Sequence, residues 1–450
     1  MNTGDIPETP AGAQLRWFLD SIAHPETMTA ADVIGRYARL WPDSSWHQGD
    51  EQGRADWKRH WDEFGEFHVE VVEAESPTQV SVVLSPVTGR KQRILFIVEE
   101  EPPHRIRLEK WSRVHDYDLQ MVAATEEHAA TLADIERRAL VVLGGDSTVA
   151  TDRGDDYFAA ARLIDDPTVF LAVVDGDPAG VSWGAQSKVV FDGEECNATY
   201  FFHLRVTPEH QGKGLWGAFD NAVWTRYWES ADLYIGYWLA ENKVWAHVAE
   251  QVQARPDFKS REWIPTVYRL LLPVTSVAGP RDGARTATPA DADRIVEILN
   301  DSHAGEELYH PYTVESLTAR LERDPALYSW GDVLLTDRAV MGVWPAGEKI
   351  EVVTTKGGEV TRSRRGHVMD YGFLAGGGGE FSDLLAASCA ELQRRGIDQL
   401  SIFTSKGARG QQELKQFKGA VEAYRFNPGM VARMPESAQN SGIYTDHLYF

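Results

Sequence analysis

Cysteine and long apolar runs are what this sequence most lacks. Only two of its 450 residues are cysteine, Cys196 and Cys389, and they stand far apart without the spacing of metal ligands. Neither a disulfide framework nor a metal site is therefore expected. No apolar run approaches the about 18 residues that a membrane-spanning helix needs, and the N-terminal segment lacks the basic start and apolar core of a signal peptide. We expect a cytoplasmic protein without a membrane partner.

Positive charge is also scarce. The chain has 45 Lys and Arg residues against 68 Asp and Glu residues, which gives a formal net charge of −23. Such a surface repels nucleic acids, so no nucleic-acid partner is expected. It attracts cations, which favours a small cationic amine as partner. Acidity also keeps proteins soluble, and the net charge alone leaves both interpretations open.

The length and the hydrophobic patterns predict three domains of α+β structure, at residues 1–116, 117–275 and 284–450. In the first domain, helical spacing changes to a period of two, which predicts helices followed by an antiparallel sheet. The second domain has elements in the order βααβββα, and the third repeats much of this pattern. A stretch with two prolines and two glycines, residues 273–285, links the two copies.

The most informative stretch combines a strand, a glycine turn and a helix. Residues 199–206 are aromatic, β-branched and apolar apart from two polar positions, which predicts a strand that ends at Pro208. The turn Gln211–Gly214 contains two glycines, and helical spacing begins directly after it. Glycines allow successive N–H groups to point inward, and a helix N-terminus adds partial positive charge. The stretch therefore predicts a site for a diphosphate.

This arrangement resembles the acyl-CoA site of the GNAT N-acyltransferases. In that family a strand that ends in Val is followed by Gln or Arg, two residues, Gly, one residue, and Gly or Ala. Here Val206 and Gln211–Gly214 match, whereas Trp216 stands at the last position. The resemblance implies that acetyl-CoA, or another acyl-CoA, is bound by Leu204, Val206, Gln211, Gly212, Lys213, Gly214, Leu215, Trp216 and Asn242.

The resemblance also implies an activity. The second domain would transfer an acetyl group from coenzyme A to a primary amine of a small metabolite or antibiotic intermediate, in secondary metabolism. The amine must lose a proton to a base, and Tyr200 and His203 are the polar candidates on the central strand. The family often has a Tyr acid one turn into the helix that Asn242 opens, but Ala249 and Glu250 stand there.

Two alternatives remain open. With Trp216 and without that Tyr, the chain could be a catalytically silent protein that binds acyl-CoA and regulates another process. Chemistry could instead lie in the first domain, whose order of helices and strands is similar to the NTF2-like (SnoaL-like) cone. We interpret the third domain as a degenerate copy, because its loop 375–380 has glycines but no Gln or Arg before them, and Glu380 would repel a diphosphate. The sequence leaves a homodimer open.

Overall fold

The computed structural model describes residues 6–40, 44–87, 90–142, 146–242, 266–277, 283–428 and 443–449. Their contacts divide the chain into two compact units. The N-terminal unit consists of Met1–Leu119 and Trp216–Glu229, and the larger unit of Gln120–Leu215 and Ser230–Phe450.

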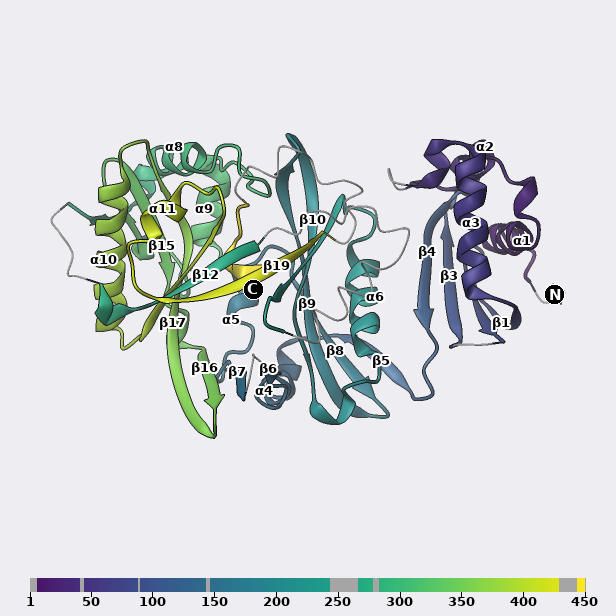
Figure 1. The fold of residues 1–450 in the computed structure, drawn as a ribbon, viewed down its shortest axis with the longest axis horizontal. Coiled ribbons are helices and arrows are strands. Elements are labelled where there is room, and N and C mark those ends of the chain that lie inside the picture. Colours follow the sequence, from purple (N-terminus) through teal and green to yellow (C-terminus); the bar gives the residue numbers. More distant parts are fainter. Residues whose placement is uncertain are drawn as a thin grey trace. The chain divides into compact units, whose positions relative to one another are not determined.

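The N-terminal unit is a four-stranded antiparallel sheet, in the order β1-β2-β3-β4, preceded in the chain by three helices. Thr9 and Thr29 start the first two helices, because their side chains accept hydrogen bonds from backbone N–H groups of the first turn. The predicted order of helices and strands is confirmed, and the NTF2-like assignment stays a prediction. The elements are α1 (Pro10–Ala23), α2 (Ala30–Arg36), α3 (Asp50–Phe64), β1 (Phe67–Ser76), β2 (Gln79–Pro86), β3 (Gln92–Val98) and β4 (Ile106–Arg113) (Figure 1).

Helix α6 (Leu215–Tyr227), which we expected within the second domain, belongs from Trp216 on to the N-terminal unit. Asn221 is both a donor and an acceptor of hydrogen bonds with residues of β4. Its side-chain amide donates to Trp111 O at 3.2 Å, and its carbonyl accepts from Lys110 Nζ at 3.0 Å. Just after the helix, Trp228 Nε1 donates to Arg107 O at 2.6 Å. The helix after the glycine turn is thus hydrogen-bonded to the last strand of the N-terminal sheet.

The described strands of the larger unit join in one mixed sheet of 15 strands, whose main path runs β13-β14-β15-β17-β18-β12-β19-β11-β10-β9-β8-β5. The strands are β5 (Leu119–Ala123), β6 (Val141–Val142), β7 (Ser147–Asp152), β8 (Thr168–Val174), β9 (Asp177–Phe191), β10 (Glu194–Val206), β11 (Leu233–Leu239), β12 (Thr266–Pro273), β13 (Arg285–Thr286), β14 (Val333–Leu335), β15 (Ala339–Trp344), β16 (Glu351–Lys356), β17 (Glu359–Phe373), β18 (Gln399–Ser405) and β19 (Ala420–Pro428). The helices are α4 (Ala129–Arg138), α5 (Ala159–Arg162), α8 (Ala292–Ser302), α9 (Val314–Glu322), α10 (Gly378–Arg394) and α11 (Gly410–Leu414).

The two halves of this sheet contain the same succession of pairings. In the first half, β9 pairs antiparallel with β10, and β10 pairs in parallel with β11. In the second half, β15 pairs antiparallel with β17, and β17 pairs in parallel with β18. A helix connects the strands of each parallel pair, as such crossovers require.

The halves exchange their last strands. Strand β12, which ends the first half in sequence, pairs with β18 of the second half, whereas β19, which ends the second half, pairs with β11 of the first. The two exchanged strands also pair with each other, so the sheet continues from one half into the other. Figure 1 shows β12 and the yellow β19 crossing between the halves. A second connection joins β7 to β16.

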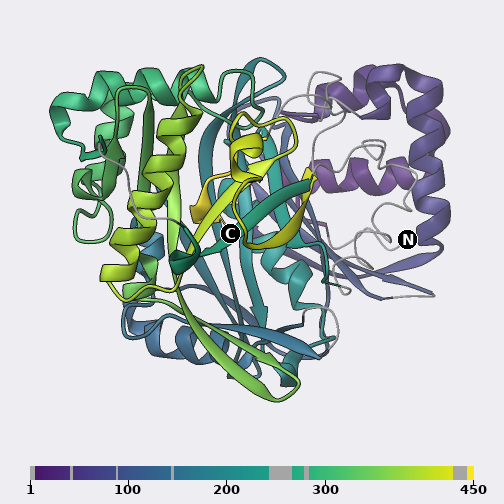
Figure 2. The same ribbon diagram turned by 60° about the vertical axis from the view of Figure 1, so that its left-hand side comes forward.

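The hydrophobic cores follow the same exchange. One core joins α4, α5 and β8–β10 to α8 and α9, so it continues through both halves. In the other core, Leu270 and Leu272 of β12 pack with Phe381 and Leu385 of α10, the helix that covers the second half (Figure 2). The larger unit therefore folds around cores to which both halves contribute.

Candidate active site

The loop after β10 is built from a threonine, a short 3-10 turn and two glycines. Thr207 N donates to a β9 carbonyl at 2.9 Å, which fixes the end of β10. The turn Pro208–His210 follows, and α6 begins directly after Gly214. Gly212 and Gly214 have φ angles of 77° and 83°, which side chains with a Cβ adopt only at a cost. The predicted glycine turn between a strand and a helix is confirmed.

This loop is open to solvent. Gln211, Gly212 and Gly214 are exposed, and nothing lies within 4 Å of the position that a Cβ of Gly212 would take. The indole of Trp216 is itself 38% exposed. The first N–H groups of a helix have no partner within the helix, and glycines in left-handed conformations direct neighbouring N–H groups to one side. Such a loop can accept phosphate groups.

The parallel strands β10 and β11 part before they reach the loop. Their pairing extends from Ala198 to Phe201 on β10 and from Leu233 to Gly236 on β11. On its other side, β10 stays paired with β9 up to Val206. The β11-facing backbone of the last β10 residues, Leu204 and Val206 included, is thus outside this ladder. An extended ligand with amide groups could pair with such an edge.

His203 lies at an irregularity of β10. Its φ of 52° coincides with a register shift against β9 between Phe202 and Arg205. Its Nε2 lies 3.4 Å from Arg153 Nη2, and because a guanidinium only donates, Nε2 must accept. Burial, and then the charges of Arg153 and Arg205, hold the pKa of His203 well below its ordinary value. The imidazole is therefore neutral at physiological pH, with one nitrogen engaged.

Tyr200 is buried, with 5% of its surface exposed. Its ring stacks face to face on Tyr449, with centroids 4.0 Å apart and planes 6° apart. Burial is the main cause that raises the pKa of Tyr200 well above its ordinary value, so the hydroxyl stays protonated. Because its hydroxyl stays protonated, Tyr200 can donate a hydrogen bond but cannot act as a base.

The remaining predicted ligands of coenzyme A follow the carboxyl ends of the parallel strands β10 and β11. Lys213 is half-buried in the loop, and Leu215 is buried at the helix start. Asn242 follows β11, where its N–H donates to Leu239 O at 2.9 Å. The helix predicted after Asn242, with Ala249 and Glu250, lies outside the described residues.

Sequence reasoning missed a buried polar network beside His203. Glu136 of α4 accepts hydrogen bonds from Arg153 Nε at 2.9 Å and from the Tyr157 hydroxyl at 2.8 Å. The guanidinium of Arg153 also lies over the Trp183 ring, 4.9 Å from its centroid. One signal could have revealed the network: Glu136 stands four residues after Leu132, on the apolar face of its helix.

The loop of the second half, after β17, is occupied by side chains of the same half. Glu380 Oε2 accepts from Arg338 N at 2.9 Å, and the Arg338 guanidinium donates to Ala375 O. A Cβ on Gly378 would lie 2.6 Å from a carboxylate oxygen of Glu413. Carboxylates therefore lie at the loop of the second half, whereas Gln211, Gly212 and Gly214 of the first-half loop are exposed.

Comparisons with solved structures identify the fold. The chain is similar to two structures of Saccharomyces cerevisiae N-myristoyltransferase with bound myristoyl-CoA. In one, the identity is 9% and the TM-score 0.53, over 77% of this chain and 87% of the other. In the second, the identity is 10% and the TM-score 0.50, over 77% and 92%. The chain therefore shares its overall fold with these N-myristoyltransferase structures. The predicted α+β class is thereby confirmed.

Another solved structure matches this chain less well. A GCN5-related N-acetyltransferase from Kribbella flavida matches with 14% identity and a TM-score of 0.37, over 69% of this chain and 71% of the other. The sequence matches no protein-family description and no curated protein. Within the described residues, no helix is long and apolar enough to cross a membrane, and no group of three His, Cys, Asp or Glu side chains could hold a metal ion.

Proposed function

We propose that the chain is an acyl-CoA-dependent N-acyltransferase and that its first half, residues 117–275, carries the activity. The observation that carries this proposal is the exposed turn with two left-handed glycines, at the end of a strand that has parted from its parallel neighbour. In this proposal the diphosphate binds backbone N–H groups of Gln211–Trp216, and the pantetheine pairs with the backbone of Leu204 and Val206. Two of these N–H groups, Gln211 N and Lys213 N, also donate to carbonyls of the preceding turn at 3.4 Å. Lys213 adds a positive charge, and Asn242 contacts the pantetheine or the adenosine-side phosphates.

Catalysis would consist mainly of positioning. The parted strands hold the thioester beside a primary amine, and backbone N–H groups at the irregularity of β10 stabilise the tetrahedral oxyanion. His203 stands at this irregularity as a neutral imidazole. We propose it as the group that receives the amine proton, directly or through water, and Tyr200 as a hydrogen-bond donor.

The donor in this proposal is acetyl-CoA, and a longer acyl chain is the alternative. The N-myristoyltransferase structures hold myristoyl-CoA. A shared fold does not determine the length of the acyl chain that a protein accepts. The acceptor is a primary amine of a small molecule. The second half would be a degenerate copy, because the carboxylates of Glu380 and Glu413 lie at its loop. The NTF2-like identity of residues 1–116 remains a proposal.

A pair of matched glycine variants tests the coenzyme site. Gly212 and Gly193 both have left-handed φ angles, 77° and 79°, and open space at the Cβ position. Gly193 lies in the β9–β10 turn, away from the loop. Gly212→Val and Gly193→Val should therefore destabilise the fold similarly, but only Gly212→Val should weaken binding of coenzyme A, by tenfold or about 1.4 kcal/mol or more. Calorimetry with coenzyme A, acetyl-CoA and myristoyl-CoA measures this difference and compares the acyl chains.

A silent acyl-CoA-binding protein is the second candidate, because Tyr200 is stacked and His203 Nε2 is engaged by Arg153. Release of free thiol from acyl-CoA in the presence of a panel of amines separates the two functions. Binding without amine-dependent thiol release would support the silent protein. No binding of any coenzyme A derivative to the wild-type chain would contradict both.

A further inference from the structure

Four arginines converge in the interior of the larger unit, and they come from both of its halves. Arg153 and Arg365 are only 2% and 8% exposed. The side chain of Arg269 is 16% exposed, and Nε of Arg205 is buried. Arg153 directly follows β7, and the others lie on β10, β12 and β17. We call these four residues the interior arginine cluster.

Two histidines connect the four arginines, because after burial the charges of Arg153, Arg205 and Arg269 lower the pKa of His203, and those of Arg269, Arg365 and Arg153 lower the pKa of His367. Arg153 Nη2 lies 3.4 Å from Nε2 of His203, which shares β10 with the cluster's Arg205. On β17, burial and then the charges of Arg269, Arg365 and Arg153 lower the pKa of His367 to about 3. Both imidazoles are therefore neutral and contribute no charge of their own at physiological pH.

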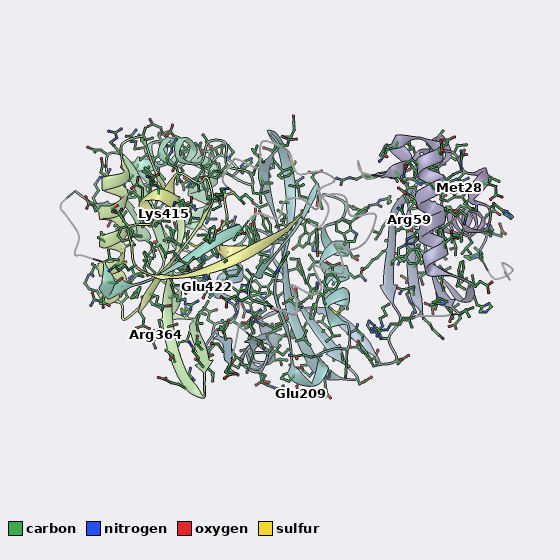
Figure 3. All side chains as sticks on the ribbon, viewed as in Figure 1. Met28, Arg59, Glu209, Arg364, Lys415 and Glu422 are labelled. Carbon is green, nitrogen blue, oxygen red and sulfur yellow. The ribbon has the colours of Figure 1, made fainter. Side chains whose placement is uncertain are left out.

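Two of the four arginines have carboxylate partners. Arg153 Nε donates to Glu136 at 2.9 Å, and Arg269 Nε donates to Glu422 at 2.8 Å. Figure 3 labels Glu422, which projects from the exchanged strand β19 (Figure 3). The charges of Glu136 and Glu422 also act on Arg205 and Arg365, respectively, but these two arginines form no ion pair of their own with them.

The other two, Arg205 and Arg365, form no ion pair with any carboxylate of the described residues. Arg365 Nε donates to the neutral amide oxygen of Gln399 at 3.0 Å. Arg205 Nη1 donates to Leu204 O, and its buried Nε has no partner among the described residues. Burial lowers the pKa of Arg365 to about 10, which still leaves it charged at physiological pH.

An uncompensated buried charge costs several kcal/mol, and a folded protein normally pairs it. A guanidinium matches the planar or tetrahedral oxygens of a carboxylate or phosphate with two parallel hydrogen bonds. We propose that the interior arginine cluster, through Arg205 and Arg365, binds an anionic group of a reactant, either a carboxylate or a phosphate ester.

The placement on a reactant rests on the proposed function. Arg205 lies between Leu204 and Val206, the two residues that would hold the pantetheine, so the anion binds beside the reacting thioester. It belongs either to the amine acceptor or to the transferred acyl group. The net charge of −23 describes the whole chain, whereas the cluster is local to the site and therefore decides the charge of the bound reactant.

Adjacent arginines on one strand provide a matched test. Arg365 is buried and without a carboxylate partner, whereas Arg364 is exposed and paired with Glu351 at 3.1 Å. The full-length protein is titrated with inorganic phosphate and with glutarate at constant ionic strength. We expect at least one probe to bind at a single site, with at least tenfold weaker binding in Arg365→Met and no change in Arg364→Met. Arg205→Gln, which should also weaken binding, is the second variant if Arg365→Met does not fold.

Thermal unfolding without added anions completes the test. Arg365→Met should be at least as stable as the wild type, because it removes a buried charge that lacks a partner. If neither probe binds, or if both variants bind as the wild type does, the inference is overturned. A lower melting temperature of Arg365→Met together with no binding would mean that a carboxylate of the chain itself occupies the cluster.

Turnover then identifies the reactant that carries the anion. Faster acetylation of 4-aminobutyrate than of butylamine assigns it to the acceptor, and faster reaction of butylamine with succinyl-CoA than with acetyl-CoA assigns it to the acyl group. Arg365→Met should abolish whichever preference is found, and equal rates in both comparisons contradict a reactant anion. Coenzyme A affinity should be unchanged in Arg365→Met. Failure of the wild type to bind coenzyme A would contradict the proposed function. The anion titration would then decide separately whether the cluster binds an anion.

Discussion

Individual buried histidines give this protein a defined response to acid. The imidazole of His367 is packed against His447, with ring centroids 4.4 Å apart, and its Nδ1 is buried without a partner among the described residues. The pKa of His367 is about 3, and that of His447 is also well below its ordinary value, mainly because of burial. In the unfolded chain both would titrate near about 6.5.

We predict that His367→Gln flattens the acid side of the stability curve. Below pH about 6.5, His367 binds a proton in the unfolded state but stays neutral in the folded state. The stability of the fold therefore decreases as the pH falls towards the folded pKa of about 3. The variant should lose up to about 1.4 kcal/mol per pH unit of this slope. Urea unfolding at pH 7, 6, 5 and 4 measures the slope. His24→Gln, an exposed imidazole, is the control, and equal slopes in wild type and His367→Gln would contradict the prediction.

At the residue scale, the sequence revealed the glycines but not the arginines. Two closely spaced glycines between a strand and a helix are typical of a tight turn, so the roles of Gly212 and Gly214 could be predicted from turn chemistry. Arg205 and Arg365 each occur on a strand, where alternation places a charged residue towards solvent. Both interact with Tyr424 of the exchanged strand β19, so their burial depends on contacts far apart in the sequence.

At the scale of single elements, β19 is the strand on which both halves depend. It pairs with β12 on one side and with β11 on the other, and its Ala423 faces Tyr268 across the first of these ladders. Ala423 O also accepts from Ala240 N at 2.8 Å. A strand with neighbours on both sides cannot accommodate proline without losing a ladder hydrogen bond.

We therefore predict that Ala423→Pro destabilises the larger unit by about 2–3 kcal/mol, because it removes a donor and leaves an acceptor of the sheet unsatisfied. The control is Val360→Pro, near the exposed end of β17, where β16 is the paired neighbour. Urea midpoints measure both changes. Similar losses in the two variants would argue that β19 behaves as an edge strand.

Most elements could be predicted from the sequence because their apolar periods are regular. The exceptions are short or interrupted. Strands β6 and β7 were not predicted, since β6 has two residues and β7 alternates polar and small side chains. Helix α5 has only four residues, too few for helical spacing to define its ends in the sequence. Local pattern fixes the type of an element more reliably than its length.

At the scale of the whole molecule, the exchange of β12 and β19 makes the two halves of the larger unit interdependent. The alternation of side chains along a strand such as β12 is the same whichever strand lies beside it. For this reason the sequence predicted two separate copies, whereas the structure has one sheet and a core that continues through both.

We predict that residues 284–450 expressed alone do not form a stable monomer, because β18 and the core under α10 lose β12. Residues 117–277 alone should fail similarly, since β11 loses β19. Co-expression of the two fragments should yield a soluble complex with the unfolding transition of a single unit. Cooperative unfolding of either fragment by itself, measured by circular dichroism, would show that the copies are independent.

The exchanged strand also sets an order of events during protein synthesis. The glycine turn that would hold the coenzyme emerges from the ribosome when half of the chain is still untranslated. The neighbour of β11, however, is β19, near the C-terminal end of the described chain. A nascent chain therefore cannot complete the wall of the proposed coenzyme slot until translation has passed residue 428, and prematurely terminated products should be inactive even though they contain every residue of the loop.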